Sequence, residues 1–81
     1  MFRNLVETVQ IEVDGHEYIA RYFELRTARG VRRFSCEVEL DAGDCVIVDD
    51  DSLSSLQLRV SIVVPAMVYS RLLAGRRSVA A

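Results

Sequence analysis

Apolar and polar residues alternate along most of the first half of the chain, which is the period of β-strands with one buried face. The segment Glu7–Val13 alternates in this way and is followed by Asp14-Gly15, a dipeptide typical of a two-residue hairpin turn. A return strand is therefore predicted at His16–Arg26. These two strands would form the first hairpin of an antiparallel sheet.

Two registers are open for this hairpin. A simple two-residue turn places Ile11 opposite Tyr18, but it also places Glu12 opposite Glu17, and like charges directly opposed are unfavourable. A bulge near Gly15 would separate the glutamates and turn the other face of the return strand inward.

A third strand is predicted at Val31–Leu40, after a loop at Thr27–Gly30. The segment Asp41–Asp44 is a turn, and Cys45–Val48 is a short apolar run that would give a fourth strand. One face of the third strand is apolar and carries Phe34, Cys36, Val38 and Leu40.

The apolar pattern changes to a helical period after Asp51. Asp51 or Ser52 is a suitable N-cap, and three consecutive aspartates favour a helix start there. Apolar residues three and four positions apart form two stripes. The first contains Leu53, Leu56, Val60, Val63, Val64 and Met67, and the second contains Leu58, Ile62, Ala66, Tyr69 and Leu73. A helix that is apolar on two faces is expected to be buried on two faces.

A strand followed by a short helix is the alternative for the same stretch. Residues 56–64 also alternate with period two, and Pro65 would then be the first residue of a helix at Ala66–Ala74. Proline inside a helix costs about 3 kcal/mol. The helix beginning near Ser52, kinked or broken near Pro65, is favoured because no turn residues separate Ser52 from Gln57.

Together these elements predict an α+β domain, in which an antiparallel β-meander of three or four strands precedes a C-terminal helix packed on one sheet face. Residues 1–75 would form one domain, and residues 76–81 a flexible tail.

Composition and charge restrict the location and the partners. The chain has 81 residues and a formal net charge of −2, which disfavours general nucleic-acid binding. The N-terminal segment has no continuous apolar run that would form a signal peptide. The uncharged stretch Val60–Ser70 is shorter than the ~20 residues of a membrane span. We therefore expect a cytoplasmic protein with reduced thiols and no membrane contact.

No set of residues has the pattern of a catalytic or metal site. His16 is the only histidine and lies beside a turn, and Cys36 and Cys45 do not complete a recognised zinc spacing. The aspartates at 49–51 lack the alternating ligands of a calcium loop. We expect a protein that is not an enzyme and has no metal or cofactor.

Arginines gather around the second loop. The group comprises Arg21, Arg26, Arg29, Arg32 and Arg33. Arginines and aromatic residues exposed on a sheet bind single-stranded nucleic acid in some folds. Interleaved glutamates favour an ordinary solvated face, so nucleic-acid contact by Arg26, Arg29, Arg32 and Arg33 is a secondary hypothesis.

The segment D-D-D-S-L-S-S-L at a helix start, after three antiparallel strands, resembles the N-terminal domain of HicB-type antitoxins, a partial ribonuclease H-like fold. The resemblance covers Val9–Val60, and no ribbon-helix-helix or helix-turn-helix segment follows before Ala81. It implies an alternative function, in which the domain binds and neutralises another protein.

The favoured hypothesis is a protein-interaction module that forms a homodimer or higher oligomer. A chain of this size has little core to cover both apolar faces of the helix, and oligomerisation would cover the second. The expected interface residues are Leu58, Ile62, Tyr69 and Leu73.

Overall fold

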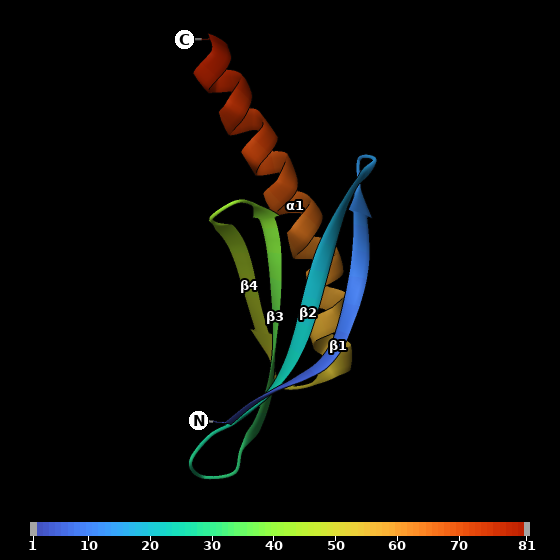
Figure 1. The fold of residues 1–81 in the computed structure, drawn as a ribbon, viewed down its shortest axis with the longest axis vertical. Coiled ribbons are helices and arrows are strands. Elements are labelled where there is room, and N and C mark those ends of the chain that lie inside the picture. The colour runs from blue at the N-terminus through green and yellow to red at the C-terminus, as the bar shows by residue number, and fades with distance from the viewer. Residues whose placement is uncertain (1, 81) are drawn as a thin grey trace.

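The computed structural model describes the backbone of residues 2–80 and the side chains of residues 2–74. Four antiparallel strands form a meander in the order β1-β2-β3-β4, and one long helix follows (Figure 1). The elements are β1 (Phe2–Val13), β2 (His16–Arg26), β3 (Arg32–Asp41), β4 (Asp44–Asp50) and α1 (Leu53–Ala80). The predicted α+β class and element order are confirmed, with four strands rather than three.

The first hairpin has the simple register. Ile11 lies opposite Tyr18, and Glu12 lies opposite Glu17. Asp14 and Gly15 both have positive φ, of 51° and 79°, as a two-residue type I′ turn requires. The alternative with a bulge near Gly15 is therefore wrong. The opposed glutamates are tolerated because both are exposed and the solvent screens their repulsion.

The register of β1 shifts elsewhere, between Leu5 and Glu7, where Val6 is an extra residue in the strand. A second shift lies between Glu39 and Asp41 in β3. A bulge bends and twists its strand. The pairing of β2 with β3 stops at Ala20 and Val38, although β2 continues to pair with β1 and β3 with β4. The two hairpins therefore diverge at this end of the sheet (Figure 1).

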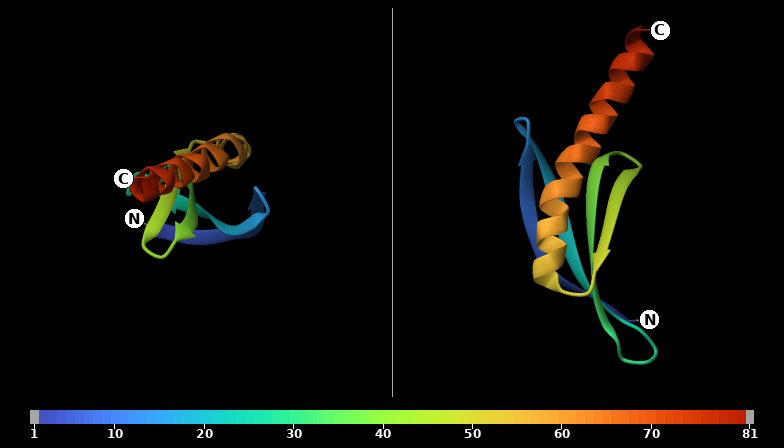
Figure 2. Two further views of the ribbon diagram at one scale, coloured as in Figure 1. Left: turned by 90° about the horizontal axis from the view of Figure 1, so that it is seen from above. Right: turned by 180° about the vertical axis from the view of Figure 1, so that it is seen from behind.

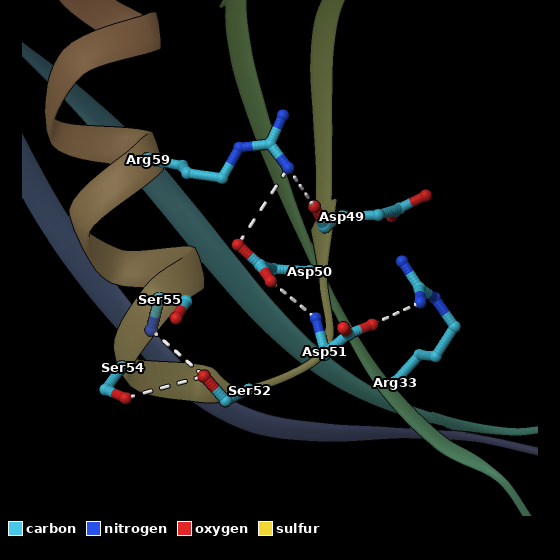
Figure 3. A network of polar contacts seen from close by, with 8 residues as sticks. All are labelled: Arg33, Asp49, Asp50, Asp51, Ser52, Ser54, Ser55 and Arg59. Carbon is cyan, nitrogen blue, oxygen red and sulfur yellow. Dashed lines mark hydrogen bonds and ion pairs between the residues drawn. The ribbon is translucent and has the colours of Figure 1, made fainter.

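The start of α1 is capped as the sequence predicted. The backbone N–H of Ser55 donates to the Ser52 hydroxyl oxygen at 3.2 Å, which satisfies one of the free donors of the first turn (Figure 3). Arg33 pairs with Asp51, and Arg59 donates to the backbone oxygen of Asp49 at 2.9 Å. These contacts join β3, the end of β4 and the second turn of the helix.

The helix continues through Pro65 without a break, so the alternative of a strand at residues 56–64 is wrong. Proline removes the hydrogen bond to the carbonyl of Ser61, but Ser61 is exposed and water can hydrate that carbonyl. The cost is offset because a helix places Leu56, Val60 and Val64, each 0% exposed, together on the sheet.

The core lies between one face of the sheet and one stripe of α1 (Figure 2). Its buried residues from the sheet are Ala20, Tyr22, Cys36, Val38, Val46 and Val48, and those from the helix are Leu56, Val60, Val64 and Val68. The predicted tail, residues 76–81, falls in the part whose side chains are not described and stays a prediction; the helical backbone runs to Ala80.

Candidate interaction surface

The outward face of α1 carries a stripe of exposed apolar side chains, which we call the outer stripe. It consists of Leu58, Ile62, Tyr69 and Leu73, with exposed fractions of 66%, 65%, 60% and 40%. Ala66, between them on the same face, is also exposed. These are the residues expected from the sequence, and the fold leaves all of them uncovered.

Leu72, which the sequence analysis did not assign to an interface, is 47% exposed. It follows the buried Val68 by one helical turn and lines a cavity with it, and it is exposed because α1 extends past the end of the sheet. Every described side chain from Tyr69 to Ala74 is exposed. The figures show this half of the helix projecting away from both hairpins (Figures 1 and 2). The length of the predicted helix, compared with that of the predicted strands, was the sequence signal that could have indicated this projection.

Polar side chains along α1 are held toward the sheet and away from the outer stripe. Gln57 donates to Glu7 at 3.3 Å, and Arg71 donates to both carboxylate oxygens of Asp44 at 2.9 and 3.1 Å. The hydrogen bond from Arg71 lowers the pKa of Asp44 below its usual value. These groups, like Arg59, are directed to sheet or loop partners, and the outer stripe itself consists of uncharged residues.

The stretch Leu53–Ala74 is long and apolar enough to cross a membrane by length and composition. The expectation that no stretch is long enough considered only the uncharged segment Val60–Ser70, and it did not detect the longer stretch. Only 22% of its most apolar 18-residue window is buried in the fold. The sheet nevertheless covers one side of it, since Leu56, Val60 and Val64 are fully buried. The outer stripe is the side that remains available to any partner.

The arginines near the second loop do not form an open cationic surface. Arg26 and Arg32 both pair with Glu24, at 3.1 and 3.2 Å, and Arg33 pairs with Asp51. These contacts lower the pKa of Glu24, chiefly through the hydrogen bond from Arg26. Among the predicted contact residues, Arg29 is the one with no ion pair to a described side chain. The carboxylates therefore neutralise most of the group.

Arg3, which the sequence analysis did not single out, lies 3.7 Å from the centre of the Phe23 ring and pairs with Glu37. Phe23 and Glu37 both lie on the sheet face away from the helix. Arg3 therefore covers part of that face, and Glu37 neutralises the charge of Arg3.

The residues considered for catalysis or metal binding are not brought together. His16 is exposed at the first hairpin turn. Cys36 is buried on the helix side of the sheet, whereas Cys45 is exposed on the opposite side. Among the described residues, no three His, Cys, Asp or Glu side chains are placed to share a metal ion.

Two cavities lie where the hairpins diverge, with volumes of about 250 and 300 Å³. Tyr18, Leu40 and Asp41 line both of them, and the Asp44–Arg71 pair lies in the first. Both are open to solvent. Since Arg71 already binds both oxygens of Asp44, that pair is occupied within the fold and offers no free acid or base.

Comparison with known proteins gives no relative for this chain: no family model, no curated protein and no solved structure matches it.

Proposed function

We propose that this protein is a cytoplasmic interaction module that associates with copies of itself through the outward face of α1. The observation that carries the proposal is the outer stripe, in which Leu58, Ile62 and Tyr69 are each at least 60% exposed on one helix face. The sheet covers only the other face of the same helix. A contiguous exposed apolar patch is typical of a protein contact surface.

Covering the outer stripe by self-association would stabilise so small a domain considerably. Covering one large apolar side chain contributes about 1.5–3 kcal/mol when burial is complete. Among the residues whose side chains are described, the buried core contains ten apolar residues, of which one is an alanine. Association would nearly double the number of large apolar side chains of α1 that are removed from water.

Light scattering coupled to size-exclusion chromatography, over a range of protein concentrations, tests the proposal. We expect the wild-type chain to elute as a dimer or larger species at high concentration. Ile62→Arg and Leu73→Arg should each give a folded monomer, because a charge placed in a buried apolar contact is costly.

The matched control is Gln57→Arg, which makes the same change of charge on the same helix. Gln57 already contacts Glu7, so an arginine there keeps an acidic neighbour outside the outer stripe. The control should associate as the wild type does. A wild type that is monomeric at every concentration, or that floats with lipid vesicles in preference to associating with itself, would overturn the proposal.

A further inference from the structure

We infer that two copies pair antiparallel along α1, with the helices crossing at Pro65 and Ala66. This inference rests on the proposed self-association and adds the identity, direction and register of the partner: a second copy of the same helix. It follows from three features of the outer stripe, namely its spacing, the size of the residues at its middle and the charges at the two ends of the helix.

The spacing of the outer stripe is symmetric about the bond between Pro65 and Ala66. Leu58 and Leu73 lie equally far from this bond, and so do Ile62 and Tyr69. An antiparallel pair related by a two-fold axis at this bond therefore places Leu58 of one copy against Leu73 of the other. It likewise places Ile62 against Tyr69, so every large side chain of the stripe meets another.

The middle of the stripe suits a close crossing. Ala66 is exposed and has only a methyl group, and the neighbouring Pro65 is half-buried. Packed helices approach to about 8–10 Å, and small residues at the contact permit the shorter distance. The larger residues on either side of Ala66 can then interdigitate above and below the crossing point.

The charges at the helix ends select the direction. The acidic residues Asp49, Asp50 and Asp51 precede the first turn of α1, and the sequence places Arg76 and Arg77 in its last turns. A parallel pair would put the aspartates of both copies at one end. The antiparallel register instead sets positions 76 and 77 of one helix opposite Ser55 and Ser54 in the first turn of the other, and it also aligns the helix dipoles favourably.

The size of the contact predicts a weak dimer. The stripe from Leu58 to Leu73 is about 23 Å long at 1.5 Å per residue. A single helix pair of this length buries less than the roughly 800 Å² per partner of standard stable interfaces. We therefore expect dissociation in the micromolar range, and the association should be examined at concentrations above it.

Cysteine crosslinking tests the register. Cys45 is exposed and is first replaced by serine, while Cys36 is 0% exposed and can be retained. In this background, Ala66→Cys, Leu58→Cys and Leu73→Cys are treated with a short bismaleimide above the dimer concentration. The Ala66→Cys chain should link to itself, because its two copies lie beside the two-fold axis.

Leu58→Cys and Leu73→Cys should link poorly when each is alone, and about tenfold better when the two are mixed, because only then do thiols face each other. Ser61→Cys, which lies on the helix outside the outer stripe, is the control and should not link. Circular dichroism confirms that each variant is folded before it is scored.

The two proposals fail in different ways. Self-linking of Leu58→Cys and of Leu73→Cys would show a parallel pair and overturn the register alone. An oligomer by light scattering with no link at any of the three positions would also overturn the register. A monomer by light scattering would overturn the proposed function itself.

Discussion

At the scale of single residues, the most perturbed groups are a tyrosine and a cysteine inside the core. Tyr22 on β2 lies opposite Cys36 on β3, and both side chains are buried. Burial raises the pKa of Tyr22 to about 12 and that of Cys36 to about 11, and their mutual contact adds to the effect for Tyr22. The fold thus holds both groups in their neutral forms.

We predict that alkali destabilises the protein between about pH 9 and pH 12. A raised folded-state pKa means that the native state keeps its proton longer than the unfolded chain does. The stabilisation is complete below the unfolded values and is lost as pH rises through the folded ones. The Tyr22 part should lie between about pH 10 and pH 12 and amount to on the order of 3 kcal/mol.

Urea unfolding at a series of pH values measures this loss, with Tyr22→Phe as the test variant. The variant should lose less stability than the wild type above about pH 10 and should match its trend below that value. The comparison is made in the Ile62→Arg background, so that self-association does not contribute, and Ser70→Ala, which removes no titratable group, is the control and should leave the pH profile unchanged. Equal slopes for Tyr22→Phe and the wild type would contradict the assignment.

At the scale of the element, α1 shows how tertiary burial outweighs a local preference. Pro65 lies within a helix of 28 residues. A proline at such a position removes one hydrogen bond and strains the preceding turn. The helix persists because Leu56, Val60, Val64 and Val68 follow one another at intervals of four and all pack on the sheet.

Pro65→Ala should therefore leave the fold intact and raise its free energy of unfolding by about 1–3 kcal/mol. The comparison is made in the Ile62→Arg background, so that self-association does not contribute to the result. Ser70→Ala, at an exposed position of the same helix, is the control and should gain no more than about 0.5 kcal/mol. A Pro65→Ala variant less stable than its parent would show that proline has a favourable role in this turn.

At the scale of the whole molecule, the mismatch in length between helix and sheet gives the protein its shape. Its principal extents are 50, 22 and 18 Å, and the long dimension includes the half of α1 that extends beyond the hairpins (Figure 2). A helix that projects in this way cannot bury its apolar side chains within one copy. Association with a second copy is the route by which a domain of this size would cover them.

Stability should consequently depend on protein concentration. Association stabilises the folded state by mass action, so the midpoint of thermal unfolding should rise as the wild-type concentration is raised through the micromolar range. Ile62→Arg should remove this dependence, whereas Gln57→Arg should retain it. Differential scanning calorimetry at several concentrations measures the midpoint, and a wild-type midpoint independent of concentration would contradict the proposed self-association.

Much of the fold could be predicted from the sequence because its signals are local. The alternation of Val9, Ile11 and Val13 needs no distant information, nor does the positive φ of the Asp14-Gly15 turn. Ser52 likewise caps the residues that directly follow it. The two apolar stripes of α1 could also be read from their spacing alone, and the structure places one on the sheet and the other in solvent.

Only the tertiary structure decided between patterns that the sequence leaves open. Residues 56–64 satisfy both the period of a strand and that of a helix, and the helix prevails because the sheet offers a face that its stripe can cover. The bulges at Val6 and Leu40, the pairing of Arg33 with Asp51, and the separation of the two cysteines depend on segments that are distant in sequence. Such contacts are chosen by register and burial across the whole sheet, and no local window of the chain contains that information.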